Sequence, residues 1–262
     1  MKSSPKISRV SSTALISVAL TFASQANAAI LGAWDDWADA GIDGTYDADF
    51  TAAGFTASLA SQNSRINSSW SSTDGTYGNV PGAPTDANGA FLTRATGTAL
   101  TLAFTLTNNT GFEYNIESFN FDFAPRSDGS DPESFGPNAF TLTYTSGGLE
   151  TAGTEIASES GLPYFLTGAA GGDPNANGNY PDYSYSLSPT LSSIVLADGE
   201  SATFTLVFSG ASGSNASNVS SMVDNVAFTG SIIPEPSTYA AMLGISVIVM
   251  AVVRRKRQAH SR

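Results

Sequence analysis

Apolar and polar residues alternate with a period of two in several separate segments of this chain. Between residues 100 and 107 the even positions hold leucine or phenylalanine, and the odd positions hold threonine or alanine. The same alternation recurs in residues 119–123, 140–144, 204–208 and 226–228. A period of two places the apolar side chains on one face of a β-strand, whereas a helix needs a period of about 3.6. Turn residues such as Asn108–Gly111 separate the segments, so the sequence predicts an all-β fold.

The alternating segments also predict how this fold buries its core. In residues 119–123 the phenylalanines share one face, and Asn120 and Asp122 lie on the outward face. Several strands with one apolar face need a second layer that covers it. We therefore expect an antiparallel, jelly-roll-like β-sandwich over residues 29–231. The chain has no cysteine, and a domain of this length is large enough to bury a core without disulfides.

The N-terminus has the three parts of a secretory signal peptide. Lys2, Lys6 and Arg9 form a basic head, an apolar run follows from residue 13 to 23, and Ala26–Ala28 supplies small residues for cleavage. A retained anchor is the alternative, but the apolar run is too short for a hydrocarbon layer of about 30 Å. We expect residues 1–28 to be removed and the rest of the chain to be exported.

The C-terminus predicts a membrane stop. Residues 238–253 carry no charge and are mostly apolar, which predicts one transmembrane helix. The tail 254–262 follows directly and opens with a basic cluster, Arg254, Arg255, Lys256 and Arg257. Positive charge beside a span marks its cytoplasmic side, so the body of the protein is expected outside the cytoplasm. A buried core helix is the alternative, and the adjoining basic cluster argues against it.

A short motif precedes this predicted span. Residues 232–237 form a linker that contains Pro234, Glu235, Pro236 and Ser237. The prolines favour an extended backbone that a protease cleft can accept.

Motif, apolar segment and basic tail together resemble the PEP-CTERM sorting signal of exopolysaccharide-producing Gram-negative bacteria. The resemblance implies that Pro234 to Ser237 are read by an exosortase-type membrane protease. It further implies a protein that is membrane-anchored before processing, and afterwards resides at the cell surface or in the extracellular matrix. The stretches Ala33–Trp37 and Met222–Gly230 resemble, more weakly, the carbohydrate-binding-like bodies of such surface proteins.

The exported body is strongly acidic. Between residues 29 and 237 it has three arginines and no lysine, against all 23 carboxylates of the chain, which gives a formal charge of −20. Such a field repels nucleic acid and anionic lipid, so neither is an expected partner. It attracts calcium and basic groups.

Few catalytic side chains are available in this body. The chain's one histidine, His260, lies in the basic tail, and the body lacks cysteine and lysine. Triads, thiol catalysis and Schiff-base chemistry are therefore excluded, and no cofactor is expected. Carboxylate pairs such as Glu113 with Glu117, or Asp131 with Glu133, leave a carbohydrate-active enzyme as the alternative, but solvated surface acids are common. We predict no enzymatic activity and assign no catalytic residue.

Calcium is the candidate ion. Asp173, Asn175 and Asn177 precede Gly178 at the alternate spacing of a calcium loop, and Asp182 is the nearest closing acid. The position where the closing acid belongs holds Ser184, so an ordinary Asn/Gly-rich loop is the alternative.

Exposed aromatic rings are the candidate glycan contacts, because the apolar face of a sugar stacks on a flat ring. The candidates are Trp70, Tyr77, Tyr180 and Tyr183, with Tyr185 beside them. Each of these rings has core packing as its alternative. The sequence thus leaves three classes open: a module that binds exopolysaccharide or another glycan, a structural matrix protein, and a carboxylate-dependent enzyme.

Overall fold

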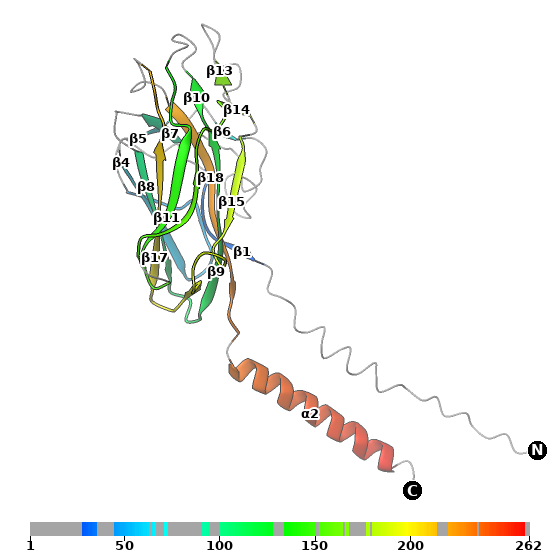
Figure 1. Cartoon of the computed structure of the whole chain (residues 1–262). Coiled ribbons are helices and arrows are strands. Elements are labelled where there is room, and N and C mark those ends of the chain that lie inside the picture. The colour runs from blue at the N-terminus through cyan, green and yellow to red at the C-terminus, as the bar shows by residue number, and fades with distance from the viewer. Residues whose placement is uncertain are drawn as a thin grey trace, which may run out of the picture. The chain divides into compact units, whose positions relative to one another are not determined.

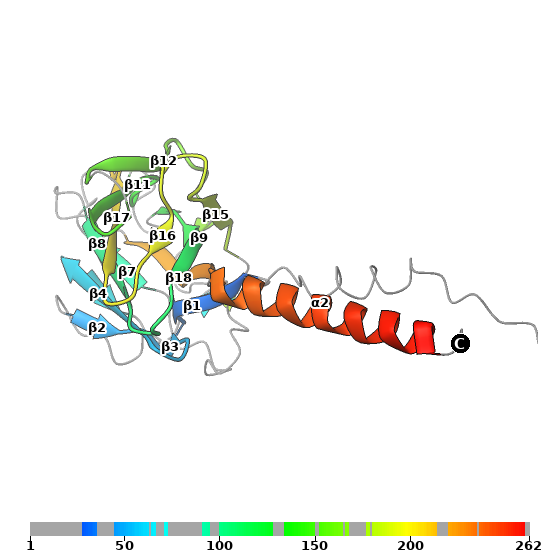
Figure 2. The same ribbon diagram turned by 90° about the horizontal axis from the view of Figure 1, so that it is seen from below.

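Two antiparallel sheets pack face to face in the body of the chain (Figures 1 and 2). The computed structural model describes residues 28–35, 45–62, 64–66, 71–72, 91–94, 100–127, 134–149, 152–164, 166–167, 177–178, 180–213, 220–234 and 236–259. Residues 28–233 form one compact unit, and the helix that begins at Pro236 belongs to a second unit. The predicted all-β sandwich is confirmed.

The first sheet combines strands from both ends of the chain. Its long strand β18 (Ser220–Ile232) pairs with β9 and with β1. The main path runs β15 (Asp182–Ser186), β9 (Tyr114–Ala124), β18, β1 (Ala29–Trp34) and β3 (Phe50–Thr51). Shorter strands extend it: β16 (Val195–Leu196) pairs with β9, β7 (Phe91–Arg94) with β18, and β5 (Ser64–Ile66) with β7.

The second sheet contains the strands with the clearest alternation. Its order is β12 (Thr154–Glu159), β11 (Ala139–Gly147), β17 (Ser201–Ser209), β8 (Leu100–Asn108), β4 (Phe55–Gln62) and β2 (Thr45–Asp47). Two short parallel pairs lie outside both sheets: β10 (Arg126–Ser127) with β13 (Leu166–Thr167), and β6 (Ser71–Ser72) with β14 (Asn177–Gly178).

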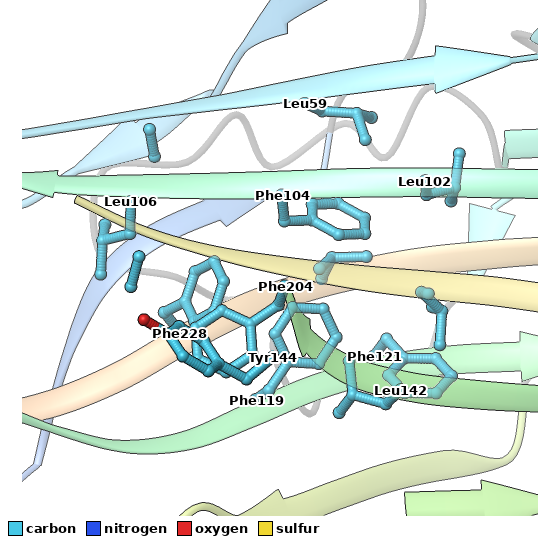
Figure 3. Packing of buried hydrophobic residues seen from close by; sticks show 14 of the residues in the cluster. Leu59, Leu102, Phe104, Leu106, Phe119, Phe121, Leu142, Tyr144, Phe204 and Phe228 are labelled. Atoms are coloured by element: carbon cyan, nitrogen blue, oxygen red, sulfur yellow. The ribbon is translucent and has the colours of Figure 1, made fainter. Parts of the chain in front are cut away.

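The core between the sheets is built from phenylalanine and leucine. The apolar residues of the five alternating segments are buried, as predicted. Phe119 of β9 lies at the centre, and its ring centroid is 4.9 Å from that of Phe228, 5.4 Å from that of Phe104 and 6.0 Å from that of Phe204 (Figure 3). Rings from both sheets thus interdigitate, which explains why the alternation in sequence is so regular.

Hydroxyl groups cover the outer face of the second sheet. Cross-strand pairs link β8 to β17, with Oγ1 of Thr105 2.9 Å from Oγ1 of Thr203 and Oγ1 of Thr107 2.7 Å from Oγ of Ser201. These residues are half-buried, as expected for polar side chains on the solvent-facing side of a sheet.

The helix α2 (Pro236–Ala259) covers the segment 238–253. Proline is well suited to a first helical position, because its missing N–H has no intrahelical partner there. The predicted helix is therefore present, but among the residues that the structure describes no helix is long and apolar enough to cross a membrane.

Candidate functional site

The structure separates the aromatic candidates into three groups. Trp70 and Tyr77 lie outside the described residues. Tyr180 is 1% exposed, so the prediction that its ring is a glycan contact is wrong, because a buried ring has no free face. Tyr183 and Tyr185 are half-buried on β15 and pack against the core. These two rings are the candidates that remain on the described surface.

The strand β15 holds both tyrosines at an edge of the sandwich. It pairs with β9, with Tyr183 opposite Phe121 and Tyr185 opposite Phe119. Residues that are directly opposite in a sheet share a face, so both rings lie on the core side of the sheet. Asp182 and Ser184 occupy the alternate positions and are exposed. The alternation of β15 therefore places both half-buried rings against the core at the edge of the first sheet.

The inner sides of these rings rest on phenylalanines. Tyr183 stacks on Phe121 at 5.4 Å between ring centroids and 17° between planes, and it meets Phe140 edge-on at 4.9 Å and 81°. Tyr185 lies farther out, 6.1 Å from Phe140 and 6.4 Å from Phe121. Contacts of this kind fix the rings in place while part of each remains accessible.

Glu159 joins this edge from the opposite sheet. It is the last residue of β12, and the Tyr185 hydroxyl donates to its Oε1 at 3.3 Å. A β-bulge in β12, opposite Leu142 and Thr143, sets its direction, because Glu155 pairs with outward-facing Thr143 whereas Glu159 pairs with core-facing Phe140. In a regular strand these two acids would share a face. The bulge therefore brings an exposed carboxylate beside the tyrosines.

Burial and charge both act on the two phenols. Burial, and then the charge of Glu159, raises the pKa of Tyr183 above its ordinary value. The same two causes, followed by the hydrogen bond to Glu159, raise the pKa of Tyr185 further. Both hydroxyls therefore stay protonated near neutral pH and can donate hydrogen bonds.

A polar network on the other face of the first sheet ties β15 to its neighbours. Ser184 donates to Oδ1 of Asn120 at 2.7 Å, and Nδ2 of Asn120 donates to Oγ of Ser118 at 2.9 Å. Ser118 in turn lies 2.6 Å from the hydroxyl of Thr229 on β18. This chain of bonds holds the edge strand, and with it the tyrosines, in register.

The same face contains acids that the sequence did not predict to be buried. Asn120 and Asp122 point away from the core as expected, yet both are 0% exposed, as is Asp224. Asn225 donates from Nδ2 to Oδ2 of Asp122 at 2.7 Å, and its backbone N–H donates to Oδ1 of Asp224 at 3.0 Å. Asn225 adopts φ 50° at a bulge in β18, a conformation that asparagine tolerates well.

The calcium residues are only partly described. Asp173 and Asn175 lie outside the described residues, the backbone of Asn177 pairs with Ser71, and Asp182 is exposed at the start of β15. In the described part of the chain, no group of three or more His, Cys, Asp or Glu side chains could hold a metal ion. The calcium site stays a prediction.

The carboxylate pairs of the enzyme alternative fall in different places. Glu117 of β9 accepts a hydrogen bond from the Ser231 hydroxyl, and Glu113 is exposed in the preceding loop. Asp131 and Glu133 lie outside the described residues. The hydrogen bond gives Glu117 a role in holding β9 against β18.

The predicted sorting motif follows directly after the sandwich in sequence. The backbone N–H of Ile233 donates to the carbonyl of Glu113 at 2.9 Å, and Pro234 is exposed. Glu235 lies outside the described residues, and Pro236 and Ser237 begin α2. Farther along this helix Arg254 and Arg255 are exposed, whereas the side chains of Lys256 and Arg257 are not described.

An exposed ring in the described part of the chain was not among the predicted glycan contacts. Phe112 is 45% exposed at the tip of the turn after β8. Asn108 braces this turn by donating from Nδ2 to the carbonyls of Phe112 at 2.8 Å and Leu196 at 2.9 Å, and Gly111 donates to Asp198 at 2.7 Å. The turn itself was predicted from Asn108–Gly111, and the phenylalanine that follows was the available signal.

The chain has distant likenesses among solved structures, two of which are a carbohydrate-binding module and a phage tailspike domain. No protein-family model and no curated protein matches the chain. A family 29 carbohydrate-binding module from Piromyces equi is 12% identical, with a TM-score of 0.31 over 72% of this chain and 87% of the module. The enzymatically active domain of tailspike protein 4 from Bacteriophage CBA120 is 11% identical, with a TM-score of 0.30 over 69% of this chain and 20% of that one.

Proposed function

We propose that this chain is an exported, non-enzymatic sandwich of the jelly-roll kind that binds extracellular glycan through Tyr183 and Tyr185. The observation that carries the proposal is the tyrosine pair itself, with its inner sides packed on Phe121 and Phe140 and its outer parts accessible beside Glu159. Residues two apart in a strand are separated by about 7 Å, which lets two rings contact one extended chain of sugars. The rings supply apolar contact, and the hydroxyls and the carboxylate bind sugar hydroxyl groups.

The rigidity of the edge supports binding rather than simple coverage of the core. Tyr183 is held on two phenylalanine rings, and Tyr185 is held by Glu159 from the other sheet. A ligand that meets rings already fixed in place loses less side-chain entropy on binding.

The charge of the body narrows the ligand class. With a formal charge of −20 between residues 29 and 237, the domain repels polymers rich in carboxylate or sulfate. The expected ligand is therefore an exopolysaccharide without dense negative charge.

Binding and catalysis are separated in one experiment. The full chain is titrated calorimetrically with the exopolysaccharide of the producing cells, and the polymer is then incubated overnight and assayed for new reducing ends. We expect saturable binding and an intact polymer. New reducing ends would support the carboxylate-dependent enzyme instead, and the absence of binding would leave a structural matrix role.

We also propose delivery by the C-terminal motif. The support is the order of Pro234, Glu235 and Pro236 directly after the last strand of the sandwich, followed by an apolar segment and a basic tail. An exosortase-type membrane protease would read the motif and release the sandwich to the cell surface or matrix.

Mass spectrometry of the protein from producing cells tests this route. We expect a mature chain that begins near Ala29 and lacks the basic tail. A tail that remains intact on the surface protein would contradict the proposed processing.

A further inference from the structure

We propose that the Tyr183–Tyr185 edge selects glycans that carry protonated amines, such as polymers of glucosamine. This inference rests on the proposed function and names the ligand class for the same site. Three features favour an amine here: the position of Glu159, the rings of Tyr183 and Tyr185, and the negative charge of the body.

Glu159 has the position and the spare capacity to receive a cation. Its Oε1 accepts one hydrogen bond from Tyr185, whereas a carboxylate offers about four lone-pair sites. The side chain is exposed, so a ligand can reach the remaining sites. An ammonium group forms a charge-assisted hydrogen bond there, roughly twice as strong as the neutral bond that a sugar hydroxyl forms.

The two rings add a second attraction for the same group. A cation within about 6 Å of a ring centroid is attracted to the face of tyrosine. Glu159 acts electrostatically on both phenols, since its charge raises the pKa of Tyr183 as well as that of Tyr185. The rings and the carboxylate therefore share one local field, and that field favours positive charge.

The surroundings of the edge are negatively charged, as Glu159 is. Asp182 begins β15 and is exposed. The exported body has no lysine, and its three arginines oppose 23 carboxylates. A cationic polymer is therefore drawn to the domain at long range and bound at the edge at short range.

A pair of matched oligosaccharides tests the inference. The full chain is titrated calorimetrically with a glucosamine hexamer and with its N-acetylated counterpart, at a pH at which the free amines are protonated. N-acetylation removes the charge and keeps the sugar ring. We expect the glucosamine hexamer to bind about fivefold more tightly, which is the effect of one partly exposed charge pair.

Two variants on β12 locate the effect. Glu159→Gln removes the carboxylate charge beside the rings, and we expect it to reduce the preference between the hexamers to the small part that the long-range field of the body supplies. Glu155→Gln is the matched control, because it removes the same charge from an outward position of the same strand. We expect Glu155→Gln to keep the preference.

The outcomes distinguish this inference from the function on which it rests. Equal affinity of the unsubstituted chain for both hexamers, or the same loss in both variants, would overturn amine selection and leave glycan binding in place. If neither hexamer nor the producing cells' exopolysaccharide bound, the proposed function itself would fail, and amine selection with it.

Discussion

The aromatic rings of this sandwich belong to two environments. Phe119 contacts rings from both sheets and is completely buried, whereas Tyr183 and Tyr185 are half-buried. The interior rings therefore contribute mainly to stability. The edge rings have part of their surface left for a ligand, so their substitution is expected to affect binding more than folding.

The largest expected effect is in the interior. Phe119→Ala should lower the free energy of unfolding by about 3–5 kcal/mol, because it removes a large side chain and leaves a cavity among rings from both sheets. Urea denaturation followed by circular dichroism measures this loss. A loss below about 1 kcal/mol would mean that the core can collapse around the gap, and the contrast with the edge would weaken.

A buried polar residue on the outer face of the first sheet should give the next largest effect. Asp122→Ala leaves Nδ2 of Asn225 without the acceptor that it has at 2.7 Å, and an unsatisfied buried group costs about 1–3 kcal/mol. The exposed acid Glu155, substituted by alanine, is the control and should change stability by less than about 0.5 kcal/mol. Equal effects in the two denaturation curves would contradict the buried polar contact.

At the edge, Tyr183→Ala should cost about 1–2 kcal/mol of stability, since one side of the ring is packed on Phe121 and Phe140. The same denaturation experiment compares it with Phe119→Ala. A loss as large as that of Phe119→Ala would place Tyr183 in the core and leave no free face for a ligand.

The smallest expected effect appears in alkaline solution. The pKa of Tyr185 is raised, so the folded state holds the phenol proton more tightly than the unfolded chain does. This contribution to stability is complete below the unfolded value of about 10 and is lost as the pH rises through the higher folded value. Tyr185→Phe should therefore lose less stability than the parent chain when the pH is raised above about 10. Parallel pH profiles of the unfolding free energy would contradict the raised pKa.

The period-two pattern predicted most of the fold. Leu100 to Leu106 and Phe119 to Phe123 occupy the buried face that alternation gives them, because inward and outward positions depend only on local strand geometry. Exposure was harder to predict. Asn120 and Asp122 face outward but are buried, and Tyr180 is buried, since burial depends on which distant segments cover a position.

The sequence predicted only part of the candidate site, because contacts between distant segments cannot be read from local strand geometry. Tyr183 and its neighbour Tyr185 could be identified as aromatic candidates, but Glu159 could not be connected with them. Its place depends on the bulge in β12 and on the way the two sheets pack together. Phe112 follows a turn that the sequence did predict. The hydrogen bonds from Asn108 that hold the backbone of this turn could not be predicted.

Binding by a double tyrosine variant tests whether Tyr183 and Tyr185 contact the glycan. The full chain with Tyr183→Ala and Tyr185→Ala is titrated with the producing cells' exopolysaccharide, after its circular dichroism spectrum has shown that the sandwich is folded. Phe112→Ala is the control, because it removes an exposed ring from the turn between β8 and β9, away from β15 in sequence. We expect at least a tenfold loss of affinity in the double variant, the effect of about 1.4 kcal/mol, and none in the control. Unchanged affinity in a folded double variant would contradict glycan binding at the tyrosine edge.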